Sequence, residues 1–213
     1  MPGTMSFFAD AVTGFLDERG IDEVTYVGVS MGGQVGLTLA LNAPDRLRRL
    51  ALVSPAGIEP FTAEEAAALN DATTAEGIVS STDEQVRQNT VLNFAEWNDE
   101  YAWIIEQRHA LSERDDFEAY AEANARSVAG MLAGDVRDRL GEIDVPTLVL
   151  FGAGDRLIPN QYLHEDMTTA DVAERAREAL PNATVQVVDE AGHLLMLEQP
   201  DVFQEDLHSF LEK

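Results

Sequence analysis

The chain has 213 residues, of which 45% are hydrophobic and 25% charged, a balance typical of a globular domain rather than of a disordered or fibrous chain. It contains no cysteine, which excludes disulfides, thiolate metal sites and a cysteine nucleophile. Asp and Glu number 39 against 14 Lys and Arg, giving a formal net charge of −25 at pH 7. We therefore expect neither nucleic acid nor an anionic membrane surface as a partner, because binding either needs basic patches.

The sequence also bears on where the protein works. No apolar run approaches the ~20 residues of a membrane-spanning helix, and residues 1–14 show no basic segment ahead of an apolar one. The four histidines lack His-x-x-x-His spacing, so no metal site is expected. No cofactor is expected either. We expect a cytoplasmic protein. Lys213 is the only lysine beside a large acidic excess, which resembles proteins of halophiles that accumulate salt.

Helical and strand patterns alternate along the chain. Apolar residues at helical spacing predict a helix over residues 6–19, ended by Gly20. Short apolar runs predict buried strands at residues 24–29, 50–53, 147–151 and 184–188. Further helices are predicted at residues 34–43, 171–180 and 201–211. This alternation indicates an α/β fold with a mostly parallel sheet covered on both faces.

Strand signals vanish over residues 59–141, where the pattern is helical. We therefore expect residues 1–58 and 142–213 to form one core, and residues 59–141 to form an inserted helical cap. One helical face is predicted from the apolar residues Phe94, Trp97, Tyr101, Ile104 and Ile105. Either this face packs the cap, or some of its aromatic side chains line an apolar substrate pocket.

The pattern Gly-x-Ser-x-Gly at residues 28–32 stands between a predicted strand and a predicted helix. A tight strand-to-helix turn would strain the backbone of Ser30 and raise its hydroxyl above the sheet edge. We expect a side chain at Gly28 or Gly32 to clash across that turn. The N–H of Met31, at the helix N-terminus, would point at a developing oxyanion. Ser30 is the predicted nucleophile, and the alternative is an ordinary glycine-rich turn.

A serine nucleophile needs a histidine base. His193 follows the last predicted strand in a short loop, at the same sheet edge as Ser30. His164, in a polar loop, is a weaker rival, and His109 and His208 fall within predicted helices, where they read as surface or packing residues.

The base in turn needs a carboxylate to orient it. Asp155 follows the strand at residues 147–151 and is the predicted acid, although such an aspartate can also simply cap a turn. Glu59, soon after the strand at residues 50–53, is the best alternative acid. The chain order Ser30, Asp155, His193 is that of α/β-hydrolases and differs from the two protease orders.

Three segments resemble the α/β-hydrolase superfamily. Residues 28–57 look like its nucleophile turn with the following helix and strand, residues 145–159 like its acid-bearing segment, and residues 191–211 like its histidine loop and last helix. The resemblance implies Ser30 as nucleophile, Asp155 as acid, His193 as base and the Met31 N–H as an oxyanion donor. The helical stretch at residues 59–141 is similar to the cap that such enzymes insert.

The chain also departs from this family. Members normally have four further strands before the nucleophile turn and a His-Gly oxyanion segment after the third of them, whereas here a single predicted helix precedes the strand at residues 24–29. The sheet is therefore expected to be incomplete on its N-terminal side. That strand would be an open edge without Lys, Pro or an evident bulge, suited to self-association or to pairing with a partner chain.

The resemblance implies a serine hydrolase of the esterase type, acting on carboxylic ester-like or related carbonyl substrates through an acyl-enzyme. The expected substrate is small, neutral and hydrophobic. One alternative uses the same triad for C–C bond hydrolysis or cofactor-free perhydrolysis. The other is a catalytically impaired C-terminal fragment, or a subunit of a split hydrolase that needs a partner.

Overall fold

The computed structural model describes residues 2–212, and within them the strands form one parallel sheet of order β1-β2-β3-β4. The strands are β1 (Val24–Val29), β2 (Leu47–Val53), β3 (Thr147–Gly152) and β4 (Ala183–Val188). All four predicted strands are present, although β2 begins at Leu47 rather than at residue 50. Because each strand runs parallel to its neighbour, the chain must cross back between strands, and it does so through helices.

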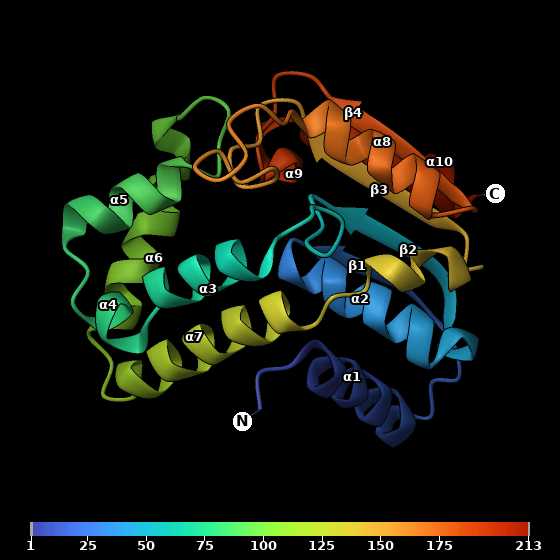
Figure 1. Cartoon of the computed structure of the whole chain (residues 1–213), viewed down its shortest axis with the longest axis horizontal. Coiled ribbons are helices and arrows are strands. Elements are labelled where there is room, and N and C mark those ends of the chain that lie inside the picture. The colour runs from blue at the N-terminus through green and yellow to red at the C-terminus, as the bar shows by residue number, and fades with distance from the viewer. Residues whose placement is uncertain (1, 213) are drawn as a thin grey trace.

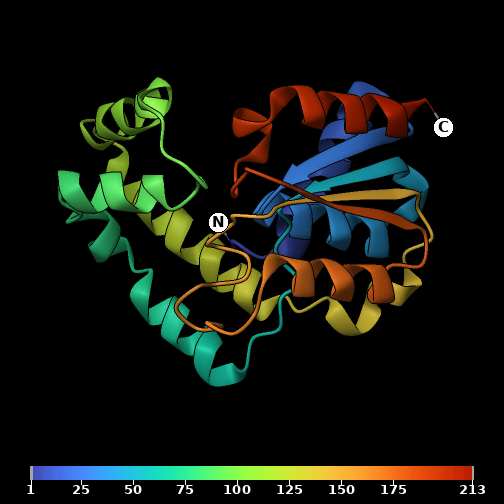
Figure 2. The ribbon, with the colours of Figure 1, turned by 90° about the horizontal axis from the view of Figure 1, so that it is seen from above.

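Helices cover both faces of this sheet (Figures 1 and 2). They are α1 (Met5–Arg19), α2 (Met31–Asn42), α8 (Thr169–Ala179), α9 (Leu195–Glu198) and α10 (Pro200–Leu211), with a short 3-10 turn, η1 (Pro44–Arg46), before β2. The helices α2 and α8 lie on one face, α1 packs on α2, and α10 covers the other face. Within residues 2–212, no helix has both the length and the apolar character that crossing a membrane requires.

The sheet side chains alternate between two apolar clusters. Leu50 and Leu52 of β2 belong to the larger cluster, beneath α2 and α8, whereas Ala51 and Val53 belong to the smaller cluster with Phe210 of α10. Successive strand residues point to opposite faces, so a continuous apolar run is needed where both faces are covered. The predicted fold class, α/β with a mostly parallel sheet, is confirmed.

Between β2 and β3 the described chain forms only helices and turns. They are α3 (Ala63–Ala72), α4 (Ala75–Val79), α5 (Asp83–Val91), η2 (Asp99–Tyr101), α6 (Ala102–Ser112), α7 (Phe117–Ala133) and η3 (Arg137–Glu142). Three of these helices begin at a threonine whose hydroxyl accepts an N–H of the first turn, namely Thr62, Thr74 and Thr82. Helices α3 to α7 form a lobe beside the sheet (Figures 1 and 2).

The continuous helical face predicted from residue 94 to residue 105 is wrong in its first half. Phe94 and Trp97 lie in an irregular segment, and the α-helix begins only at Ala102. Asn98 accepts the N–H of Glu100 through its side chain and starts the short turn η2 there instead. The spacing of the aromatic residues is compatible with a helix, but here their rings come together without one.

The strand that precedes Ser30 lies at the edge of the sheet, since β1 pairs only with β2 among the described strands. It is therefore not the buried strand that its composition predicts, and Val27 leaves 46% of its surface exposed. Its pairing register shifts between Val24 and Thr25, an irregularity that the sequence did not reveal. Beyond that shift the edge presents unpaired backbone groups, as an open strand does.

Candidate active site

The predicted nucleophile, acid and base lie at one edge of the sheet. Ser30 follows β1, Asp155 follows β3 after a short turn, and His193 lies in the loop after β4. Parallel strands end at the same edge, so three residues far apart in sequence converge there. In open α/β sheets this carboxyl edge is also where ligands bind.

The turn at Ser30 has the strained geometry that the motif predicts. Ser30 has φ 54° and ψ −121°, a conformation that side-chain-bearing residues rarely adopt, and it directly precedes α2. Its N–H donates to the carbonyl of Val53 at 2.9 Å, which fixes the turn to the end of β2. A Cβ at Gly28 would overlap the backbone carbonyl of Gly32, so the glycine at this position is required.

The expectation that Gly32 also avoids a clash is wrong. Outside its chain neighbours and the backbone of its own helix, a Cβ at Gly32 would meet no heavy atom within 4 Å. The close approach instead occurs one residue later, because a Cβ at Gly33 would lie 2.7 Å from the Cβ of Pro55. The second glycine of the motif is thus sterically free in this chain, and Gly33 lets α2 approach the loop after β2.

Met31 is the first residue of α2. The N–H groups of a first helical turn have no acceptor within the helix, and the helix dipole adds positive potential at that end. The N–H of Met31 stays the predicted donor to an anionic oxygen beside Ser30.

His193 and Asp155 form a buried imidazole–carboxylate pair. Nδ1 of His193 lies 2.8 Å from Oδ2 of Asp155, and the two residues are 3% and 8% exposed. The other carboxylate oxygen, Oδ1, accepts the N–H groups of Leu157 at 2.8 Å and Ile158 at 3.0 Å. With the carboxylate ionised, Nδ1–H donates to it, and Nε2 is left to accept a proton.

Ser30 and His193 line the same cavity, of about 350 Å³. The loops at the sheet edge contribute one side of it, and α3 and α7 contribute the other. Its apolar wall consists of Ala63, Ala66, Leu69, Val128, Met131, Leu132, Leu157 and Ile158. His193 is therefore hydrogen-bonded to Asp155, and it lines the same cavity as Ser30.

The alternative in which the predicted aromatic face lines this cavity is not supported. Phe94 is 1% exposed and stacks on Tyr101 with ring centroids 4.4 Å apart, and Trp97 meets both rings edge-on. The hydroxyl of Tyr101 donates to the carbonyl of Leu197 at 3.2 Å. These rings pack the lobe against the segment that follows His193. Of the two alternatives for the aromatic residues, the structure therefore supports packing.

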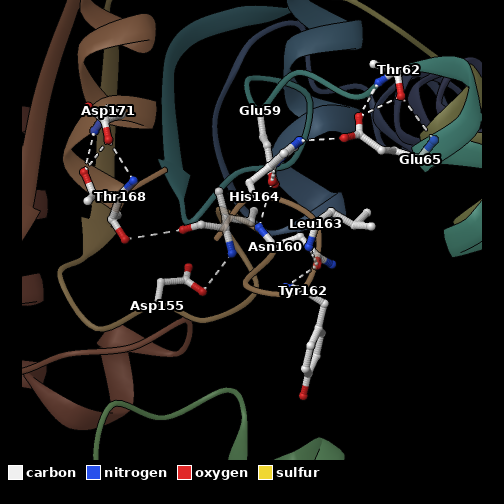
Figure 3. Close-up of polar contacts among 12 residues, drawn as sticks. Glu59, Thr62, Glu65, Asp155, Asn160, Tyr162, Leu163, His164, Thr168 and Asp171 are labelled. Atoms are coloured by element: carbon white, nitrogen blue, oxygen red, sulfur yellow. Dashed lines mark hydrogen bonds and ion pairs between the residues drawn. The ribbon is translucent and has the colours of Figure 1, made fainter. Parts of the chain in front are cut away.

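The rival acid and the rival base pair with each other (Figure 3). Nδ1 of His164 lies 2.5 Å from Oε1 of Glu59, and the same oxygen accepts the N–H of Asn160 at 2.7 Å. Glu59 is 4% exposed and lines the cavity, and burial raises its pKa, with the nearby Asp155 adding to the increase. Glu59 thus pairs with His164 and not with His193, the histidine that is hydrogen-bonded to Asp155.

The remaining histidines lie away from the cavity. His109 is on α6, 3.4 Å from the carboxylate of Asp83, and His208 is on α10. Among the described residues, no group of three or more His, Asp or Glu side chains is arranged to hold a metal ion.

Comparison with known proteins extends these observations. The family model for the alpha/beta hydrolase fold matches residues 2–200. A carboxylesterase of Bacillus subtilis is 28% identical over 219 residues, covering 98% of this chain and 64% of that protein. A 2-hydroxy-6-oxononadienedioate/2-hydroxy-6-oxononatrienedioate hydrolase of Cupriavidus pinatubonensis is 28% identical over 205 residues, covering 93% of this chain and 65% of that protein.

The solved structures agree on the fold. A probable hydrolytic enzyme from Pseudomonas aeruginosa PAO1 superposes with a TM-score of 0.86 at 22% identity, covering 100% of this chain and 71% of that one. The chain spans between about half and two thirds of the length of such curated relatives. With a family match over nearly all of its residues and a fold that superposes on a known member's, the chain belongs to the alpha/beta hydrolase fold family.

Proposed function

We propose that this protein is a serine hydrolase that cleaves carboxylic ester-like bonds in small, neutral, hydrophobic substrates through an acyl-enzyme. One observation carries the proposal: His193, buried and hydrogen-bonded to Asp155, lines the same cavity as Ser30, whose strained backbone precedes a helix N-terminus. Such a pair beside a serine is the arrangement that activates a hydroxyl for attack.

The proposed reaction has two halves. Oγ of Ser30 attacks the substrate carbonyl while Nε2 of His193 takes the hydroxyl proton, and the N–H of Met31 stabilises the oxyanion. His193 then gives the proton to the leaving alcohol, and an ester of Ser30 remains. In the second half His193 deprotonates a water that attacks this ester, and Ser30 recovers its proton. Asp155 stabilises the imidazolium in both halves. No cofactor takes part.

The substrate class is inferred from the cavity walls. The sides contributed by α3 and α7 are apolar, and a cavity of about 350 Å³ suits a small molecule. The charged groups at the wall are paired, Asp135 with Arg137 at 2.6 Å and Glu59 with His164. A charged substrate would have to break these pairs or bury its own charge unpaired, which is costly.

The experiment measures hydrolysis of p-nitrophenyl esters from acetate to octanoate by the purified chain in 2 M KCl. We expect turnover that is highest for short to medium acyl chains and is absent in Ser30→Ala. A vinylogous diketone acid is assayed in parallel, because C–C bond hydrolysis and perhydrolysis can use the same triad. The similarity to the Cupriavidus pinatubonensis hydrolase supports that alternative. A higher kcat/KM for the diketone than for every ester would contradict the esterase proposal and favour C–C bond hydrolysis.

A second candidate function is that of a hydrolase part that works only with a partner polypeptide. The exposed edge of β1 favours it, since Val27 and the unpaired backbone of that strand could accept another strand. The chain also spans only part of the length of its curated relatives. On this candidate the isolated chain fails to react with a fluorophosphonate at Ser30, and Val27→Lys abolishes its self-association in light scattering. Rapid labelling of a monomeric wild-type chain would exclude this candidate.

A further inference from the structure

The loop that carries Asp155 is long and has no regular structure of its own. This acid loop, residues 153–168, joins β3 to α8 through turns alone. It supplies Asp155 to His193, and it also supplies Leu157, Ile158 and Asn160 to the cavity wall. A loop without helix or strand bonds needs other anchors to hold a side chain in one place. The position of Asp155 therefore depends on what fixes this loop.

Glu59 is such an anchor (Figure 3). It lies on the segment that follows β2, outside the acid loop, and its Oε1 accepts both the Asn160 N–H at 2.7 Å and Nδ1 of His164 at 2.5 Å. Both partners belong to the acid loop. A carboxylate oxygen of the buried Glu59 thus ties two points of the loop to the segment that follows the neighbouring strand β2, in a setting where charged hydrogen bonds are strong.

His164 continues the connection to the helical lobe. Its Nε2 lies 3.5 Å from Oε1 of Glu65, and its ring stacks on Phe61 with centroids 5.4 Å apart. Glu65 in turn caps α3, because its side chain accepts the N–H of Thr62 at 2.7 Å. The imidazole is thereby held between two carboxylates, that of Glu59 on the cavity wall and that of Glu65 in the first turn of α3 (Figure 3).

Resting on the serine hydrolase proposed above, we propose that Glu59 and His164 are positioning residues, which hold the acid loop so that Asp155 stays aligned with His193. The connection is short. Oδ1 of Asp155 is fixed by the N–H groups of Leu157 and Ile158, close in the chain to Asn160, which Glu59 holds. Movement at Asn160 would therefore reach both the carboxylate of Asp155 and the cavity wall. The charged groups facing Glu59 are His164 and Asp155, and those facing His164 are Glu59 and Glu65.

The test compares Glu59→Ala, Glu59→Gln and His164→Asn with the wild-type chain in 2 M KCl. Glu59→Ala removes both anchors, and we expect kcat for the best p-nitrophenyl ester to fall about 10- to 100-fold, the scale of a misplaced catalytic group. Glu59→Gln keeps an oxygen for the Asn160 N–H, so we expect kcat within about 3-fold of wild type. His109→Asn is the matched control for His164→Asn, because that imidazole pairs with the exposed Asp83 away from the cavity.

Hydrogen exchange gives a readout that does not depend on activity. We expect backbone amides of residues 156–168 to exchange at least 10-fold faster in Glu59→Ala than in wild type, and those of β3 to be unchanged. If the wild-type chain has no ester turnover, the proposed function fails, and exchange alone still decides whether Glu59 holds the loop.

Two results would overturn the positioning role. One is unchanged loop exchange in Glu59→Ala, and the other is an unchanged kcat per fluorophosphonate-titrated site despite a lower Tm. The latter result would mean that Glu59 stabilises the fold without aligning Asp155. If Glu59→Ala does not fold, His164→Asn decides, because it changes the less buried member of the pair. Loop exchange and kcat equal to those of the wild type in His164→Asn would equally contradict the proposal.

Discussion

Nδ1 of His193 lies 2.8 Å from Oδ2 of Asp155, across the ends of the adjacent strands β4 and β3. Both side chains are buried, so water does not compete for this hydrogen bond. The carboxylate is itself held by two backbone N–H groups, which fixes the oxygen that faces the imidazole. In the proposed reaction this pair leaves Nε2 of His193 to take the proton of Ser30.

Substituting Asp155 by Asn tests this relationship. The amide would offer its NH₂ to Nδ1 and favour the imidazole tautomer that carries its proton on Nε2, which cannot act as the base. We expect kcat for ester hydrolysis to fall by about 10³- to 10⁴-fold, as loss of such a carboxylate typically does. Steady-state kinetics at pH 8 measure the effect.

Asp166→Asn is the matched control, because it makes the same chemical change in the same loop at an exposed position. Its kcat should equal that of the wild type. Equal activities of the Asp155 and Asp166 variants would show that Asp155 does not orient the base.

The turn at Ser30 yields a prediction about stability. Gly28→Ala places a Cβ against the carbonyl of Gly32 and within 2.8 Å of the Tyr26 ring, so we expect a loss of at least about 2 kcal/mol in the free energy of unfolding. Gly32→Ala meets open space in the first turn of α2, and we expect it to be neutral or to stabilise by up to about 1 kcal/mol. Urea unfolding of the two variants in 2 M KCl measures both values. Equal losses would contradict the steric account of this turn.

Much of the core could be predicted from the sequence because the local signals agree with the tertiary structure. The apolar runs at residues 24–29 and 147–151 lie in β1 and β3, and Asp155 and His193 meet because strand ends in a parallel sheet share an edge. The motif at residues 28–32 indicated the strained turn at Ser30 for the same reason, since a strand and a helix flank it. For these features, the order of the elements along the chain and the direction of the strands are enough for a correct prediction.

The rest could not be predicted because it depends on the paths of loops. Glu59 and His164 each fitted a role beside His193 or Ser30, and only the course of the acid loop shows that they hold each other. Phe94 and Trp97 have helical spacing but lie in an irregular segment, where Phe94 stacks on Tyr101 and Trp97 meets both rings edge-on. Gly32 matches the motif, yet the close approach falls at Gly33, because it depends on Pro55, a residue of another loop.

Glu59 also gives stability a pH dependence. Burial raises its pKa in the folded state above the ordinary value of 4.5, so folding favours its protonated form. Its contribution to stability is fully present below pH 4.5 and is lost as the pH rises through the folded-state pKa. The uncharged amide of Glu59→Gln resembles the protonated carboxyl and does not titrate, so this variant does not lose that stability as the pH rises. We therefore expect Glu59→Gln to gain stability relative to wild type between pH 4.5 and neutrality, in urea unfolding at constant 2 M KCl.

A constant difference between the two chains across this range would show that the pKa of Glu59 is not raised on folding. The opposite slope would show that His164 stabilises the carboxylate more than burial destabilises it.

The net charge predicts a requirement for salt. Spread over a sphere of roughly 20 Å radius, a net charge of −25 costs roughly 20 kcal/mol of self-repulsion at 0.1 M salt and roughly 7 at 1 M. Both figures are upper limits for the effect of self-repulsion on the free energy of unfolding, because the charges of the unfolded chain repel one another too. We propose a halophilic protein and expect its Tm to be at least about 10 °C higher in 2 M KCl than in 0.1 M KCl, equivalent to a gain of about 3–5 kcal/mol.

Sucrose serves as the control for this experiment, since it stabilises folded proteins by exclusion without screening charge. Equal Tm values at the two salt concentrations would contradict the halophilic proposal. A gain in sucrose as large as that in KCl would show that screening is not its cause.

The most direct test of the account is ester turnover by the wild-type chain and by Ser30→Ala, purified and assayed side by side in 2 M KCl. The account predicts turnover by the wild type at a rate that a fluorophosphonate reduces in proportion to the Ser30 it labels, and no turnover above background by the variant. Equal activity of the two chains, or labelling of the wild type at another residue, would contradict it.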